Sequence, residues 1–126
     1  MTLKVFYVDD EPDISEVAAM ALEIDPDIEV RTATCAADAL AQLDAGGWRP
    51  DVFLLDVMMP GMDGPGLLTE IRARPAHDTA PAIFITARAP PGERDTFLAA
   101  GGVGVIAKPF DPMILAATVR DLMTAR

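Results

Sequence analysis

The chain has 126 residues, of which 51% are hydrophobic, and this is the size and composition of one globular domain with a packed core. Its net charge of -10 disfavours direct contact with nucleic acids and with anionic membranes. No apolar run reaches the roughly 20 residues that a membrane helix needs, and the N-terminus turns acidic too early for a secretory signal. We therefore expect a single cytoplasmic domain over residues 1–126.

Five short runs rich in apolar residues are predicted to form strands. They cover residues 4–8, 29–33, 52–56, 82–86 and 103–107. Three of them are apolar almost throughout, which is typical of strands in a parallel sheet because helices bury both faces of such a sheet.

Amphipathic segments between these runs are predicted to form helices. The first carries an apolar stripe with helical spacing, formed by Ile14, Val17, Ala18, Ala21 and Leu22. Three more are expected over residues 36–44, 64–74 and 94–100, the second of them with Asp63 as N-cap. A last helix is expected to begin at Pro112, behind an N-cap at Asp111.

The strict alternation of strands and helices predicts an α/β fold with a parallel sheet, right-handed crossovers and helices on both faces. Two side chains with reactive groups receive no functional role. The single cysteine, Cys35, is expected to be a buried or half-buried thiol, and His77 is expected to be an exposed loop residue.

Polar residues occur at the C-terminal ends of four predicted strands. They are Asp9, Asp10, Asp56, Thr86 and Lys108. In an open α/β sheet these strand ends meet at one edge, where the functional crevice lies. Three carboxylates that lie close together repel one another unless a cation lies among them, and oxygen ligands suit Mg²⁺. The sequence therefore predicts a divalent metal site at this edge, with a lysine and a hydroxyl group beside it.

This constellation resembles the receiver domain of two-component response regulators along essentially the whole chain. The matching segments are "VDDE" (8–11), "LLDVMMPGMDG" (54–64), "TA" (86–87) and "KPF" (108–110). Each segment alone is a weak signal, but four of them in register on an alternating β/α chain are specific. The resemblance implies a flavodoxin-like (βα)5 three-layer sandwich whose five-stranded parallel sheet has the order 2-1-3-4-5.

The resemblance also implies what the site does. Asp56 would be the phosphoacceptor, Thr86 the switch hydroxyl and Lys108 the partner of the phosphoryl group. The donor would be a sensor histidine kinase or a histidine phosphotransfer protein, and the output would be a phosphorylation-dependent contact with a downstream protein. Apart from its own phosphorylation and dephosphorylation, such a domain catalyses no reaction.

The metal ligands that the resemblance implies come from two of the matching segments. They would be Asp9, Asp10, Asp56 and the backbone carbonyl of Met58. Asp10 would bind Mg²⁺ directly and Asp9 through a water molecule, and Mn²⁺ would be an alternative ion.

The sequence departs from the family pattern at two places. The position three residues before Lys108, where the family usually carries an aromatic switch residue, is Val105. Pro90 and Pro91 lie in the loop after Thr86, where each proline fixes φ and removes an amide donor. We therefore expect coupling to the output surface through Thr86, without the usual rotation of a ring. The resemblance also implies a cis Lys108-Pro109 bond.

Other functions fit the same architecture less well. A flavin-binding module would need a phosphate-binding loop after the first strand, where "DDEPD" repels phosphate. A Mg²⁺-dependent phosphohydrolase with an aspartyl-phosphate intermediate shares the nucleophile and the metal, but a chain of this length has no room for a substrate cap. Because no effector domain follows, we expect a stand-alone receiver. A phosphorelay intermediate and a receiver excised from a hybrid kinase remain alternatives.

Overall fold

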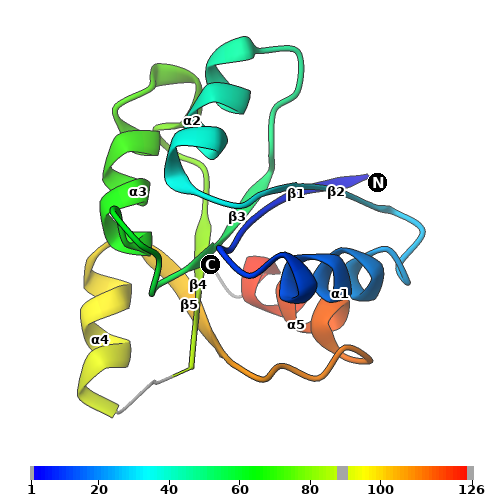
Figure 1. Ribbon diagram of the computed structural model, residues 1–126. Coiled ribbons are helices and arrows are strands. Elements are labelled where there is room, and N and C mark those ends of the chain that lie inside the picture. The colour runs from blue at the N-terminus through cyan, green and yellow to red at the C-terminus, as the bar shows by residue number, and fades with distance from the viewer. Residues whose placement is uncertain (1, 88–90, 125–126) are drawn as a thin grey trace.

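The computed structural model describes residues 2–87 and 91–124, with residues 91–94 described by their backbone only. Its elements are β1 (Leu3–Val8), α1 (Pro12–Leu22), β2 (Ile28–Ala33), α2 (Ala36–Ala45), β3 (Val52–Asp56), α3 (Gly64–Arg72), the short 3-10 helix η1 (Pro75–His77), β4 (Ala82–Thr86), α4 (Pro91–Ala99), β5 (Gly102–Ala107) and α5 (Leu115–Thr124). Within the described residues, the strands form one parallel sheet in the order β2-β1-β3-β4-β5, which confirms the predicted order (Figure 1).

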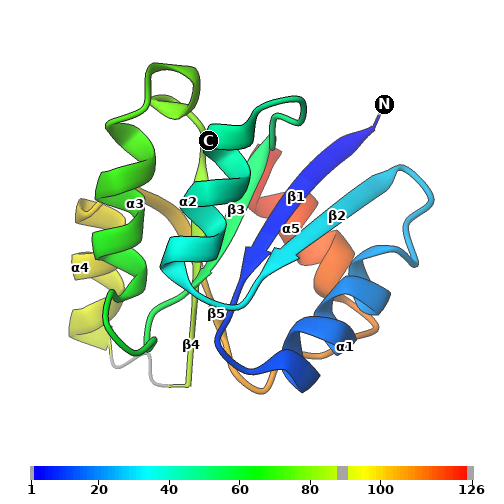
Figure 2. The same cartoon turned by 45° about the horizontal axis from the view of Figure 1, so that its top comes forward.

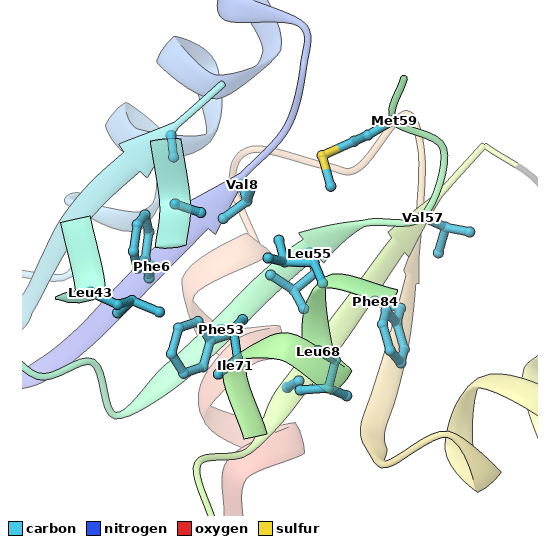
Figure 3. Packing of buried hydrophobic residues seen from close by; sticks show 14 of the residues in the cluster. Phe6, Val8, Leu43, Phe53, Leu55, Val57, Met59, Leu68, Ile71 and Phe84 are labelled. Carbon is cyan, nitrogen blue, oxygen red and sulfur yellow. The ribbon is translucent and has the colours of Figure 1, made fainter. Parts of the chain in front are cut away.

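Helices cover both faces of the sheet and make a three-layer sandwich. α2, α3 and α4 lie on one face, and α1 and α5 lie on the other (Figures 1 and 2). Figure 3 shows the core on the first face, where Phe6, Phe53 and Phe84 from three strands meet Leu68 and Ile71 of α3. None of the helices in the described ranges is both long enough and apolar enough to cross a bilayer.

The central strand β3 sets the position of the edge where the polar residues meet. All five of its residues are buried, because the sheet continues on both sides and helices cover both faces. The pairings Asp56 with Ile85 and Thr86 with Ala107 bring the ends of β3, β4 and β5 level. All the strands run in one direction (Figure 2), so the C-terminal ends of β1, β3, β4 and β5 meet at a single edge.

The structure corrects the predicted buried face of α1. Ala18, Ala21 and Leu22 are buried, but Val17 is 43% exposed and Ser15 is buried in its place. The small side chains of Ser15 and Ala18 lie on the face that packs against the sheet. This rotation of the helix turns Val17 toward solvent.

Helix α5 begins three residues later than predicted. Residues 112–114 form a turn, and the carboxylate of Asp111 accepts the backbone N–H of Met113 at 2.9 Å. The N–H of Ile114 donates to the Asp111 carbonyl at 3.2 Å, an i to i+3 bond that is tighter than the α-helical bond. Asp111 therefore caps a turn, and the α-helix starts at Leu115. Of the two prolines after Thr86, Pro91 opens α4, and Pro90 lies outside the described residues.

The predictions for Cys35 and His77 were both wrong. Cys35 is exposed, and its sulfur accepts the backbone N–H of Asp38 at 3.4 Å as the N-cap of α2. His77 is only 5% exposed, because η1 brings its ring edge-on to Phe53 at 6.0 Å between centroids. Its Nδ1 atom is buried without a hydrogen-bond partner. Both residues therefore serve the fold, one as a helix cap and the other as part of the core.

We compare the free energy of unfolding of a His77→Phe variant with that of wild type. The difference is expected to shift in favour of the variant as pH falls from about 7 to about 5. Burial lowers the pKa of His77 below its ordinary value of 6.5, and the charges of Arg49 and Arg74 lower it further. The unfolded chain takes up this proton at a higher pH than the folded chain, so wild type loses stability below the ordinary value. Urea unfolding of both proteins across this range measures the difference, and a difference that does not change with pH would contradict the assignment.

Candidate functional site

The side chain of Lys108 links the polar residues that the strands deliver to the edge of the sheet. Its Nζ atom lies 2.8 Å from Oδ2 of Asp9 and 3.4 Å from Oδ1 of Asp56, and a third carboxylate, that of Glu11, lies 3.6 Å away. The Lys108 backbone N–H donates to the carbonyl of Thr86 at 2.8 Å, which ties the start of the β5–α5 loop to the end of β4. The Lys108-Pro109 bond is cis, as expected. The predicted cluster of Asp9, Asp56, Thr86 and Lys108 is therefore present.

Asp56 lies at the C-terminal end of a fully buried strand and is itself only 3% exposed. Burial raises its pKa to about 7, and the negative charge of Asp9 adds to this shift. Lys108 lowers the pKa of Asp56 by its charge and by a hydrogen bond, while a hydrogen bond with Asp10 favours the protonated form. The carboxylate of Asp56 is therefore held in a place where its negative charge is costly.

Lys108 itself remains a cation in this surrounding. Burial lowers its pKa, but hydrogen bonds to Asp9 and Asp56 and the charges of these two groups outweigh that effect and raise the pKa above its ordinary value. Only 12% of its side chain is exposed. The site therefore holds a fixed positive charge beside Asp56.

Three carboxylate side chains lie close together beside Lys108. Oxygen atoms of Asp9, Asp10 and Glu11 lie within 4.8 Å of one another. Asp9 is fully buried, while Asp10 and Glu11 are increasingly exposed, so this group opens from the interior of the site toward solvent. Carboxylate oxygens converging at a loop edge match the donor set that Mg²⁺ prefers.

The loop after β3 forms the opposite wall of the site. A surface hollow is lined by Asp10 and by residues 57–63. Met59 from this loop is buried and points back toward Val8 and Leu55 of the core, so it anchors the loop (Figure 3). Met58 is 74% exposed, which leaves its side chain outside the packing.

Gly64 joins this loop to α3 at a point where no side chain fits. The N–H of Gly64 donates to the carbonyl of Val57 at 3.1 Å, and the carboxylate of Asp63 accepts the N–H of Gly66 at 2.8 Å, as the predicted N-cap. A Cβ atom at Gly64 would lie 2.7 Å from the backbone oxygen of Asp56. The first residue of α3 therefore packs directly against the backbone of Asp56.

Replacing Gly64 with alanine is expected to destabilise the fold by about 1 to 3 kcal/mol and to weaken Mg²⁺ binding, since either Asp56 or α3 must move. Gly46 offers a matched control: its φ of 73° makes alanine unfavourable there too, but nothing lies within 4 Å of the new Cβ and the residue is far from the site in sequence. Calorimetric titration with Mg²⁺ measures the binding of both variants. Equal losses of Mg²⁺ affinity in the two would show that Gly64 acts only through general stability.

Two residues at the site received no role from the sequence. Glu11 brings the third carboxylate to the group, although the acidic segment that contains it was recognised. Tyr7 is fully buried, and its hydroxyl donates to Oδ2 of Asp9 at 2.9 Å. The available signal was the alternation of side chains along a strand, which places residues 7 and 9 on the same face.

Val105, at the position of the usual aromatic, is half-buried and packs against the core on the α2–α4 face.

Comparison with known proteins shows the family of the chain. The family model described as "Response regulator receiver domain" matches residues 5–120. The transcriptional regulatory protein TrcR of Mycobacterium tuberculosis is 36% identical over 122 residues, covering 96% of this chain and 45% of that protein. Response regulator Rre1 of Synechocystis is 34% identical over 121 residues, covering 96% of this chain and 52% of that protein. The chain thus spans about half the length of these relatives.

A solved structure shows the same fold over nearly the full length. The chemotaxis response regulator CheY4 of Vibrio cholerae superposes with a TM-score of 0.85 at 30% sequence identity, and the match covers 97% of this chain and 99% of that one. The family match spans most of the chain, and the strand order is the one that the resemblance implied. The chain therefore belongs to the response regulator receiver domains, the phosphoacceptor signalling domains of two-component systems.

Proposed function

We propose that this receiver accepts a phosphoryl group on Asp56 in a reaction that requires Mg²⁺. The observation that carries the proposal is the position of Asp56, which is buried at the end of β3 with Lys108 Nζ 3.4 Å from its carboxylate. The same Nζ atom also contacts the carboxylate of Asp9, and Asp10 forms a hydrogen bond with Asp56. The donor is a sensor histidine kinase or a histidine phosphotransfer protein, and the domain acts in the cytoplasm. Beyond its own phosphorylation and dephosphorylation it catalyses no reaction.

The residues divide the work according to their charges. Asp56 attacks the phosphoryl group through a carboxylate oxygen and becomes an acyl phosphate, while the donor's nitrogen or oxygen leaves with its electron pair. The ammonium group of Lys108 leaves its contacts with Asp9 and Asp56 and binds the phosphoryl oxygens. The Thr86 hydroxyl donates a hydrogen bond to the phosphoryl group. Asp9, Asp10, Asp56 and the backbone carbonyl of Met58 would hold Mg²⁺, Asp10 directly and Asp9 through a water molecule, with Mn²⁺ as a substitute. The ion would supply charge stabilisation for the phosphoryl oxygens.

Incubation with acetyl phosphate tests this proposal without a cognate kinase. In the presence of Mg²⁺, intact-mass measurement should show one added phosphoryl group per chain. The same incubation with excess EDTA should show none, because the phosphoryl charge is then not neutralised. Addition that is equally rapid in EDTA would contradict the metal requirement.

Replacing Lys108 with alanine is expected to leave Mg²⁺ binding in place and to uncouple phosphorylation from conformational change. The charge that approaches the phosphoryl group is removed, whereas the carboxylates that bind the ion remain. Amide NMR with and without beryllofluoride, a phosphoryl mimic, measures the change. Lys4→Ala is the matched control, since Lys4 lies at the opposite end of β1 from the site. A spectral response in Lys108→Ala as large as in the control would contradict this role.

The output is a changed surface for a protein partner, reached by a shift in population between two conformations. With Val105 in place of a ring, the coupling is proposed to pass from the Thr86 hydroxyl to the loop that follows it. One new charge-assisted hydrogen bond supplies about 1.5 to 3 kcal/mol, which is sufficient for a partial shift.

A further inference from the structure

Tyr7 is the single tyrosine of the chain, and its hydroxyl group lies inside the site. The residue is fully buried in β1 with its side chain on the same face as that of Asp9, and the hydroxyl donates to Oδ2 of Asp9 at 2.9 Å. The neighbouring buried positions 5, 6 and 8 carry apolar side chains, so the hydroxyl is the polar group in the buried part of the strand that leads to the acidic segment.

Three donors on two oxygen atoms fix the orientation of the Asp9 carboxylate. Oδ2 accepts from the Tyr7 hydroxyl and from Lys108 Nζ, at 2.9 and 2.8 Å. Oδ1 accepts from the backbone N–H of Glu11 at 3.0 Å. Because Tyr7 is completely buried, rotation of the Asp9 carboxylate away from it would leave the tyrosine hydroxyl buried without its partner.

We propose that Tyr7 is a positioning residue for the metal and for Lys108, acting through Asp9. Its hydroxyl holds the carboxylate in the orientation that presents one oxygen to Lys108 and keeps the other beside Asp10 and Glu11. Groups that orient a metal ligand commonly change metal affinity by tenfold or more when they are removed. This inference rests on the proposed function, since it assumes that Asp9 helps to hold Mg²⁺.

A purely structural role for the hydroxyl makes a different prediction. If Tyr7 only satisfied the buried Asp9 carboxylate, its removal would lower stability while Mg²⁺ affinity of the folded protein stayed the same. If Tyr7 positions Asp9, the hydrogen bond must also respond when the ion arrives. The two roles are therefore separated by measurements on the metal, in addition to measurements of unfolding.

The single tyrosine allows the hydrogen bond to be observed directly. Protein labelled with ¹³Cζ-tyrosine gives one resonance, which is sensitive to hydrogen bonding of the hydroxyl group. We expect this resonance to move as Mg²⁺ is added, with the same dissociation constant that calorimetry gives for the ion. A resonance that stays in place at saturating Mg²⁺ would overturn the proposal, and this measurement does not depend on any variant folding correctly.

The variant Tyr7→Phe removes the hydroxyl and keeps the buried ring. Its affinity for Mg²⁺, measured by calorimetry on folded protein, should fall about tenfold. The matched control is Ser15→Ala, which removes another buried hydroxyl that contacts Asp9. The Ser15 hydroxyl donates to the backbone carbonyl of Asp9 at 3.4 Å and does not contact its carboxylate. The affinity of the control should stay within about twofold of wild type, because the orientation of the carboxylate does not depend on Ser15.

The outcomes separate this inference from the function on which it rests. If wild type, Tyr7→Phe and Ser15→Ala all bind Mg²⁺ with the same affinity, the role of Tyr7 is wrong and the proposed metal site still holds. Wild type that does not bind Mg²⁺ would overturn both.

Discussion

Replacing Asp56 with asparagine is expected to abolish phosphorylation by acetyl phosphate in the presence of Mg²⁺. Asparagine has nearly the shape of aspartate, so the packing at the end of β3 should be kept, but its neutral amide is not a nucleophile toward phosphorus. Wild type should gain one phosphoryl group and the variant none. Intact-mass spectrometry of both proteins after the same incubation measures this difference directly.

A second Asp→Asn substitution controls for non-specific labelling. Asp78 is exposed and follows η1, away from the cluster around Lys108. The Asp78→Asn variant should be labelled as fully as wild type. Labelling of Asp56→Asn to the same extent as Asp78→Asn would show that the acceptor is another residue.

Mg²⁺ is expected to stabilise the protein more at about pH 8 than at about pH 5, and the buried carboxylate of Asp56 is the reason. The folded protein keeps the Asp56 proton up to about pH 7, whereas the ordinary pKa of the group is 3.8. Between these values the unfolded chain has released a proton that the folded chain still binds, so the stability of the metal-free protein falls as pH rises through this window. Above about pH 7 the folded protein carries the full negative charge of Asp56, so the loss of stability no longer grows. A cation bound beside Asp56 reduces this loss.

The size of this effect can be isolated with the same variant. Each unit of pKa shift corresponds to about 1.4 kcal/mol, and the shift from 3.8 to about 7 is about three units, so the Asp56 carboxylate should lower the stability of the metal-free protein by on the order of 4 kcal/mol above neutral pH. Asp56→Asn carries no charge there and should be the more stable protein without metal. Thermal unfolding with Mg²⁺ and with EDTA, at several pH values, tests both statements. A gain from Mg²⁺ that is the same at every pH in wild type would argue against a raised pKa for Asp56.

The sheet and its polar edge were predictable because they depend on patterns that tertiary contacts reinforce. Residues 52–56 and 82–86 form strands with the predicted bounds, since short continuous apolar runs are typical of strands in a parallel sheet whose two faces are both covered. Once the sheet is parallel, the C-terminal ends of its strands meet. Asp9, Asp56, Thr86 and Lys108 therefore come together for a reason that the sequence contains.

The errors arose where tertiary packing decides between local alternatives. Spacing along α1 allowed either Val17 or Ser15 at the edge of the buried face, and contact with the sheet selected Ser15. His77 looked like a loop residue because polar residues and prolines surround it, yet η1 turns its ring onto Phe53. At Asp111 a capping signal was recognised correctly, but the carboxylate caps a turn that precedes the helix.

The partners of individual polar atoms were the least predictable part of the site. Strand alternation places Tyr7 and Asp9 on one face, but the distance between the hydroxyl and the carboxylate depends on rotamers that the surrounding core selects. The same holds for Lys108, which lies nearer to Asp9 than to Asp56. Such choices decide how the site works, and they depend on the packed structure.

Chemical identification of the phosphorylated residue tests the central claim most directly. After incubation with acetyl phosphate and Mg²⁺, borohydride reduces an acyl phosphate on aspartate to the alcohol of homoserine and releases phosphate, which marks the acceptor permanently. Fragment-ion sequencing of the digested protein should then find homoserine at position 56 alone. Homoserine at any other aspartate, or a folded protein that binds Mg²⁺ and acquires no phosphoryl group, would contradict the assignment of Asp56 as the phosphoacceptor.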